Sequence, residues 1–137
     1  MAYWLLKSEP FKYAWERLVR DGRTHWDGVR NFQATNNLKA MRKGDQAFFY
    51  HSNEGLAIVG IAEIVKEFYP DPGDKSGKFG MVDLKPLRPL ERPVTLQEIK
   101  AEPRLADLAL VRQSRLSVVP VSAAHWKILC GMGGVRP

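Results

Sequence analysis

The 137-residue sequence predicts an α+β fold, a small barrel-like mixed sheet with flanking helices, organised as a single domain over residues 1–137. Strand-like and helix-like patterns alternate irregularly, without an internal repeat, a low-complexity tract or a linker. A nearly continuous apolar run at residues 56–65, LAIVGIAEIV, is typical of a strand buried on both faces or lining a small barrel. The length suffices to close one hydrophobic core.

Five segments are predicted to be β-strands, because they alternate apolar and polar residues or are apolar throughout, and turn signals bound them. The turn Asn53-Glu54-Gly55 separates the second from the third and predicts a hairpin. A polar loop at residues 69–78 precedes the fourth. The predicted strands are residues 3–9, 46–52, 56–65, 79–87 and 116–121.

Four segments are predicted to be helices. Residues 13–21 and 31–41 carry apolar side chains at helical spacing, and a glycine follows each of them. Thr95 and Glu98 form a capping box for a short helix, and Ser122 caps a closing helix at residues 123–132.

The charge balance suits a partner that carries phosphates. Lys and Arg outnumber Asp and Glu by 21 to 15, a formal net charge of +6, and neutralised phosphates release counterions. Ordinary solubility explains the same excess. No apolar run approaches the length that crosses a bilayer, so no membrane association is expected. The first residues turn polar too soon for a signal peptide, and Cys130 has no disulfide partner. We therefore expect a cytoplasmic protein of bacterial type, or a nuclear one in a eukaryote.

The most informative motif is HWDGVRN at residues 25–31, which places Trp26 in a polar loop. A tryptophan face stacks on a nucleic-acid base at about 1–3 kcal/mol. Arg30 can meet a phosphate and Asn31 can bond a base edge. The alternative interpretation is that Trp26 is a packing anchor at the edge of the sheet.

The motif KSEP places a hydroxyl at the end of the first strand. Ser8 shares a strand face with Trp4 and Leu6, so a polar group ends an apolar row. This arrangement favours a polar contact at the mouth of a pocket. Alternatively, Glu9 and Pro10 only terminate the strand.

Two further polar segments have several interpretations. YHSN gathers His51 and Ser52 at the end of a strand, but no G-x-S-x-G elbow surrounds the serine and no acidic partner for the histidine is evident. Catalysis by this pair is therefore disfavoured. RQSRLSV offers Arg112 and Arg115, either of which can bind phosphate or remain an unpaired surface side chain.

Metal and cofactor motifs are missing from the sequence. His25, His51 and His125 have no metal-ligand spacing with one another or with Cys130, and neither a P-loop nor a dinucleotide fingerprint occurs. Cys130 lies among apolar residues of the last helix and is predicted to be part of the core. The sequence predicts no cofactor, no metal and no enzymatic activity.

Several segments, taken in order, resemble the EVE domain family: WLLKSEP, WDGVRNFQATNNLKAM, GDQAFFYHSN, GIAEIVKEFYPDP, MVDL and RQSRLSVVPVS. The resemblance runs from about Trp4 to the final helix. It implies a PUA-like fold, a small mixed β-barrel with flanking helices, related to the YTH domain that binds methylated adenine in RNA. It also implies recognition of modified bases in DNA or RNA.

The resemblance assigns roles to individual residues. Trp26 matches the aromatic side chain that forms one wall of the YTH base cage. Asp27 and Gly28 fall where that domain bonds the exocyclic amine of the base through its backbone. Ser8 and Glu9 match the strand end that supplies polar contacts to the ring.

Two positions depart from the family pattern. Phe79 stands where many members have tryptophan, and it still offers an aromatic face as a second wall. Residues 12–14, Lys-Tyr-Ala, stand where relatives often have a serine that caps a helix.

Taken together, the sequence predicts a module that binds a modified, most simply methylated, base of DNA or RNA, with a separate enzyme as a possible partner. The alternatives are a small hydrolase using His51 and Ser52, or an interaction protein that binds a metabolite or a peptide end. Arg30 and Arg115 are predicted to hold phosphates. The predicted pocket residues are Ser8, Glu9, Trp26, Asp27, Gly28, Asn31, His51, Ser52 and Phe79.

Overall fold

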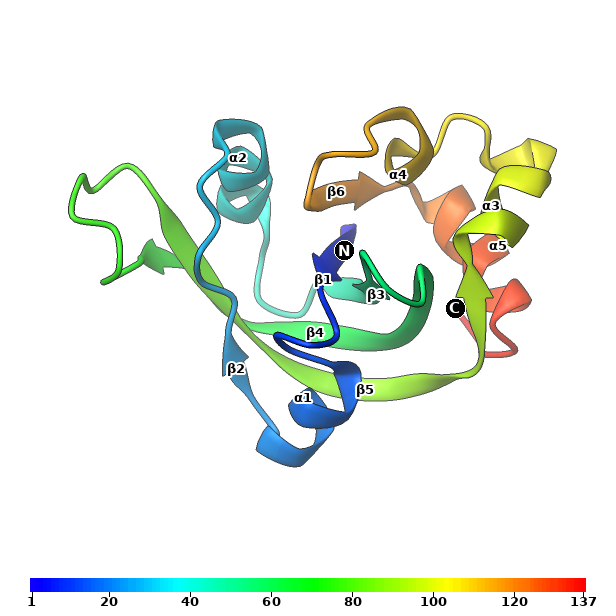
Figure 1. The fold of residues 1–137 in the computed structure, drawn as a ribbon, viewed down its shortest axis with the longest axis horizontal. Helices are drawn as coiled ribbons and strands as arrows, with labels where there is room; N and C mark the ends of the chain where they lie inside the picture. The colour runs from blue at the N-terminus through cyan, green and yellow to red at the C-terminus, as the bar shows by residue number, and fades with distance from the viewer.

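The computed structural model describes residues 1–137 and contains one six-stranded mixed sheet in the order β2-β5-β4-β3-β1-β6 (Figure 1). β1 lies inside the sheet, parallel to β3 and antiparallel to β6, and the other neighbouring strands are antiparallel. The strands are β1 (Tyr3–Ser8), β2 (Thr24–His25), β3 (Gln46–His51), β4 (Ala57–Pro70), β5 (Gly80–Thr95) and β6 (Val118–Val121).

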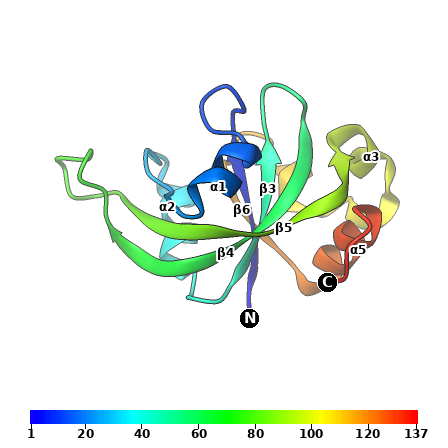
Figure 2. The same cartoon turned by 90° about the horizontal axis from the view of Figure 1, so that it is seen from below.

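The predicted α+β class is confirmed, with the qualification that hydrogen bonds do not close the sheet. β2 and β6 are its two end strands, and they do not pair with each other. β4 and β5 are 14 and 16 residues long and bend together as one ribbon (Figure 2). Their pairing shifts register at four places, and each irregularity adds bend and twist. The barrel-like shape therefore comes from the curvature of β4 and β5 and not from closure of the sheet.

The helices flank the sheet at both ends (Figure 1). Local capping explains where several of them begin. The side chain of Thr95 accepts from the N–H of Glu98, whose carboxylate accepts from the N–H of Thr95, so the predicted capping box is confirmed. Ser122 likewise accepts from the N–H of His125 and begins the closing helix as predicted. The helices are α1 (Trp15–Asp21), α2 (Phe32–Ala40), α3 (Leu96–Ala101), α4 (Ala109–Arg112) and α5 (Ala123–Met132), with a 3₁₀ turn at Pro103–Leu105.

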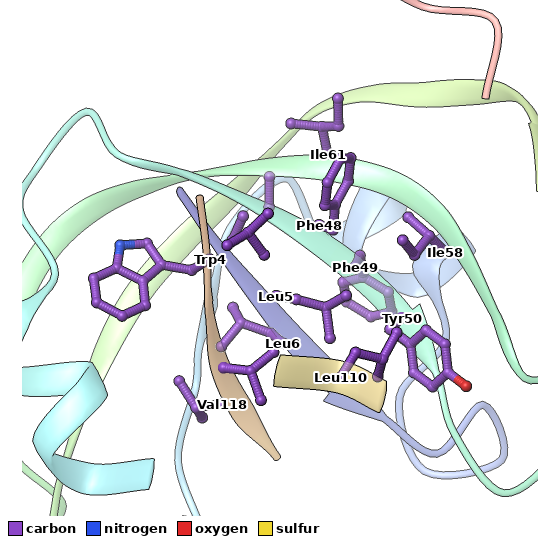
Figure 3. Packing of buried hydrophobic residues seen from close by; sticks show 14 of the residues in the cluster. Trp4, Leu5, Leu6, Phe48, Phe49, Tyr50, Ile58, Ile61, Leu110 and Val118 are labelled. Atoms are coloured by element: carbon purple, nitrogen blue, oxygen red, sulfur yellow. The ribbon is translucent and has the colours of Figure 1, made fainter. Parts of the chain in front are cut away.

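One core runs through the sheet and joins it to the helices. Leu6 of β1 is in register with Phe49 of β3, and both side chains are buried in the interior (Figure 3). Trp126 of α5 is fully buried and stacks on Tyr3 and Phe48, with ring centroids 4.4 and 3.9 Å away. These contacts fix β1, β3 and α5 relative to one another.

Cys130 belongs to this core, as predicted. It is fully buried on α5, and burial raises the pKa of its thiol to about 11. The thiolate is therefore scarce at neutral pH, and the cysteine serves packing.

β5 is much longer than the predicted strand at residues 79–87, although Pro86, Pro89 and Pro93 lie within it. The short β2 pairs only with Asp83 and Leu84 of β5. Beyond that point one edge of β5 needs no partner, so prolines without an N–H are tolerated there. The sequence also did not predict β2 and α4, which have two and four residues.

Gly60 of β4 allows Trp15 of α1 to pack against the sheet. A Cβ at residue 60 would stand 2.6 Å from three carbons of the Trp15 ring, closer than any real contact. We expect Gly60→Ala to lower the free energy of unfolding by about 1–3 kcal/mol, as overpacking does. Urea denaturation followed by tryptophan fluorescence measures this loss.

Gly131→Ala is the matched control. Residue 131 lies inside α5, and nothing beyond its chain neighbours and the backbone of its own helix lies within 4 Å of the point that a Cβ would occupy, so alanine should be neutral or stabilise by up to about 1 kcal/mol. Equal stabilities for the two variants would contradict close packing at Gly60.

Candidate nucleic-acid site

A cavity of about 660 Å³ opens where the end of β1, the segment at residues 24–30 and the loop at residues 114–117 meet. Only 3 of its 16 lining residues are hydrophobic, so it is a polar pocket with a small aromatic part. It brings together most of the predicted site, namely Ser8, Glu9, Trp26, Asp27, Gly28, Arg30, Ser52 and Arg115.

Trp26 is both a packing residue and part of the pocket wall. The Trp26 side chain meets Phe49 edge-on, with centroids 5.6 Å apart, and the backbone N–H of Trp26 donates to the carbonyl of Val82. Although only 9% exposed, it lines the cavity. The second aromatic in the wall is Tyr13, whose ring lies 6.5 Å from Trp26 at an interplanar angle of 83°.

The strand ends beneath the pocket are joined by backbone and side-chain hydrogen bonds. The N–H of Ser52 donates to the carbonyl of Ser8, which ties the end of β3 to the end of β1. The hydroxyl of Ser8 donates to the carbonyl of Tyr13 at 2.5 Å. The N–H of Lys7 donates to Ser117, and its ammonium donates to the carbonyl of Ser114.

Asp71 anchors the loop that follows Trp26. Its carboxylate, almost fully buried, accepts from the N–H of Gly28 at 3.0 Å, from the guanidinium of Arg30 at 2.9 Å and from the N–H of Gly73 at 2.8 Å. The bond from Gly28 is the largest cause that lowers the pKa of Asp71 below its usual range. Gly28 has φ 76°, a backbone conformation that glycine adopts without strain.

A second buried carboxylate, Asp83 of β5, anchors the segment before Trp26. It is contacted by the guanidinium of Arg23 and by Nδ1 of His25, each at 2.9 Å, and by the hydroxyl of Tyr69. Burial raises the pKa of Asp83, but these three hydrogen bonds outweigh it and bring the pKa to about 2. His25, held in this way, lines the pocket.

Arg30 lines the pocket but is already engaged by the protein. Its Nη1 donates to Asp71 and to the carbonyl of Val29, and its guanidinium lies 5.7 Å from the ring centre of Phe79. Arg115, by contrast, is an exposed residue of the pocket rim. Of the two predicted phosphate ligands, Arg115 has the more available charge.

Three predicted pocket residues do not line the cavity. The side chain of Asn31 accepts from the N–H of Ala34 and caps α2, and it borders a smaller cavity of about 310 Å³ that Arg115 also lines. Phe79 packs against Phe32 at 5.0 Å between centroids. His51 turns toward α1.

His51 supplies the cap that α1 lacks. The N-cap residue, Ala14, has no side chain that can accept a hydrogen bond, and Nε2 of His51 accepts from the N–H of Trp15 at 3.1 Å. Burial lowers the pKa of His51, which keeps the ring neutral and Nε2 an acceptor. α1 thus has a cap although residues 12–14 contain no serine.

The sequence did not single out several polar lining residues, among them Lys12, Tyr13, Thr24 and Ser117. Lys7, Lys12, Arg30 and Arg115 face two carboxylates, Glu9 and Asp27, so the wall carries four positive and two negative groups. No group of three or more His, Cys, Asp or Glu side chains is arranged to hold a metal ion. No helix has the length and apolar character needed to span a bilayer.

The EVE domain family profile matches residues 2–132. This chain belongs to the EVE domain family. A solved structure of a protein from Rhodopseudomonas palustris is 59% identical, with a TM-score of 0.93, and the match covers 98% of this chain and 94% of that one. Thymocyte nuclear protein 1 of Rattus norvegicus is 36% identical over 98% of this chain and 75% of its own length.

Two further structures bear on the site and the fold. The human THYN1 protein, crystallised in complex with DNA containing 5-methylcytosine, is 33% identical, with a TM-score of 0.91 over 100% of both chains. The YTH domain of the Zygosaccharomyces rouxii MRB1 protein is 17% identical, with a TM-score of 0.62 over 99% of this chain and 88% of that one. The YTH likeness is one of fold, and it confirms the expected similarity to the fold of the YTH domain.

The cap on α1 predicts a pH-dependent contribution to stability. Because the folded-state pKa of His51 lies below its unfolded value of about 6.5, the unfolded chain takes up the proton first as pH falls. The contribution of His51 to the free energy of unfolding is thus fully present above the unfolded pKa and is lost as pH falls through the folded pKa. We expect His51→Ala to cost about 1 kcal/mol at neutral pH and to flatten the decline of stability on acidification.

Adding Ala14→Ser to the His51→Ala variant should recover part of the loss, because serine caps a helix from its own side chain. Chemical denaturation at a series of pH values measures both effects. An unchanged pH dependence in His51→Ala, or no recovery in the double variant, would contradict the capping role.

Proposed function

We propose that this protein is a non-catalytic reader of a modified base in nucleic acid, which it binds in the pocket at the end of β1. The observation that carries the proposal is the pocket itself, a cavity of about 660 Å³ with Trp26 in its wall and an excess of basic side chains. The relative crystallised with 5-methylcytosine-containing DNA has the same fold over its whole length, which supports this choice of ligand.

The dimensions of the pocket suit one nucleotide. Sites for small ligands usually measure about 300–1,000 Å³. A base inside a duplex is out of reach of such a cavity, so the base must be unstacked or come from a single strand. Inside, Trp26 and Tyr13 offer aromatic surface, and a methyl group adds apolar contact with them.

The hydrogen-bonding groups limit how the base edge is read. The N–H of Gly28 already donates to Asp71. The backbone of this loop therefore offers its carbonyl oxygens as hydrogen-bond acceptors for the base. An exocyclic amine is a donor and matches such acceptors. The hydroxyl of Ser8 donates to Tyr13, which leaves its oxygen lone pairs as acceptors as well.

The basic side chains of the pocket have different roles. Arg115 and Lys12 lie on the pocket wall with exposed side chains, and we propose that they hold the phosphates on either side of the bound base. Arg30 acts chiefly on the loop through Asp71.

We propose no chemistry at this site. The His51 and Ser52 pair that would suit a hydrolase is divided, because Nε2 of His51 accepts from Trp15 while Ser52 lines the pocket. A separate enzyme would act on the nucleic acid that this protein binds. The protein would work wherever that nucleic acid lies, in the cytoplasm of a bacterium or the nucleus of a eukaryote.

Trp26→Ala should remove the preference for modified DNA. Loss of one stacked base costs about 1–3 kcal/mol, so we expect affinity for a 5-methylcytosine oligonucleotide to fall roughly 10-fold or more. Fluorescence anisotropy with methylated and unmethylated strands measures it. Because Trp26 also packs on Phe49, Trp26→Phe is a second variant that keeps an aromatic ring in the core. Val19→Ala, on the exposed surface of α1, is the control. A folded Trp26→Ala protein with wild-type preference would leave the tryptophan a packing role only.

Arg115→Ala should weaken binding to methylated and unmethylated strands by the same factor. A phosphate contact carries no base information, and its loss should reduce the salt dependence of log Kd by about one. Arg104→Ala, which removes an exposed arginine paired with Glu102 outside the pocket, is the matched control. If only the methylated strand loses affinity, Arg115 reads the base and the proposed division of roles is wrong.

A further inference from the structure

Beside the pocket, two phenylalanines form an aromatic surface that the core does not use. Phe32, the first residue of α2, is 61% exposed, and its ring lies 5.0 Å from that of Phe79 at an interplanar angle of 33°. We infer that this pair, the Phe32–Phe79 platform, stacks the base next to the one held in the pocket. The inference rests on the proposed function and adds a second nucleotide subsite to it.

The exposure of Phe32 is not explained by the fold. α2 contacts the sheet through Ala34, Thr35 and Leu38, which are buried, and Phe32 lies off that face. A helix also needs no phenylalanine at its first position, because Asn31 already caps it. An exposed aromatic face next to a polar pocket is the type of surface on which single-stranded bases stack.

The platform begins where the pocket ends. Arg30 lines the pocket, and its guanidinium lies over the ring of Phe79 at 5.7 Å from the centroid. Asn31 and Gln33, the residues before and after Phe32, line the smaller cavity together with Arg115, which lines the pocket too. A strand with one base in the pocket therefore has an aromatic surface and basic side chains directly adjacent to it.

The platform is also held in place before any ligand arrives. The N–H of Phe79 donates to the carboxylate of Asp74 at 2.8 Å, and its carbonyl accepts from the N–H of Asp71 at 3.4 Å. Asp71 in turn holds Arg30 and Gly28. Pocket loop and platform are thus parts of one hydrogen-bonded unit, which limits the entropy lost when two consecutive nucleotides bind.

The test pairs Phe32→Ala with removal of the neighbouring base. The probes are short single-stranded oligodeoxynucleotides with one 5-methylcytosine, either intact or with an abasic site immediately 5′ or 3′ of it. In the wild-type protein, one of the two abasic probes should bind roughly 10-fold more weakly than the intact strand. In Phe32→Ala, the intact strand should bind with that reduced affinity, and the abasic site should cost nothing further.

Phe32→Tyr keeps an aromatic face and should behave as the wild-type protein, and Val19→Ala, which shortens another exposed apolar side chain, is the control. An equal abasic penalty in wild type and Phe32→Ala would overturn the platform while leaving the pocket reader intact. Failure of the wild-type protein to bind any methylated strand would instead remove the proposed function and the inference with it. Light scattering without DNA tests whether a second copy of the chain occupies the platform instead. If the wild-type protein is a dimer and Phe32→Ala is a monomer, the surface serves self-association and the inference is wrong.

Discussion

A buried carboxylate between two loops is the constraint on which the site depends. Asp71 lies after the last residue of β4, and its oxygens accept from Gly28, Arg30 and Gly73. A charged group with so little access to water is stable only while such donors remain in place. The loop at residues 27–30 is therefore held to one conformation by the cost of leaving Asp71 without partners.

The second carboxylate, Asp83, acts on the other end of the same segment. Arg23 and His25 contact it before Trp26, while Asp71 holds the residues after Trp26. The tryptophan thus lies on a short stretch of chain fixed at both ends, on a loop that belongs to no regular element of its own. A reader of bases benefits from this arrangement, because a preorganised wall loses little conformational entropy when the ligand arrives.

The sequence predicted those parts of the fold and site that local signals determine. Ser122 and the Thr95–Glu98 capping box gave the starts of α5 and α3, since a cap involves residues three positions apart. The resemblance to the EVE family implied that Ser8 and Trp26 lie in one pocket, and both line the same cavity.

The remaining parts depend on residues far apart in the chain. His51 caps α1 from 36 positions away, and Phe79 meets Phe32 across two loops, so neither role has a signal in the neighbouring residues. The two anchoring aspartates are also distant in sequence, since Asp71 lies 43 positions from Gly28 and Asp83 lies 58 positions from His25. The sequence also does not show that β5 continues beyond residue 87 through Pro89 and Pro93, because whether a proline interrupts a strand depends on which edge of that strand has a neighbour.

The position of β1 affects how the protein folds during its synthesis. This strand lies between β3 and β6, and Lys7 near its end bonds to Ser114, which is 107 positions further along the chain, and to Ser117. During synthesis, one edge of β1 therefore lacks its partner until β6 has been made, and contacts this distant in sequence form late in folding. Ser114, Arg115 and Ser117 of the pocket wall directly precede β6, so this part of the wall is made together with that strand. A chain that stops before this segment lacks three of the 16 residues that line the pocket, and its site is incomplete.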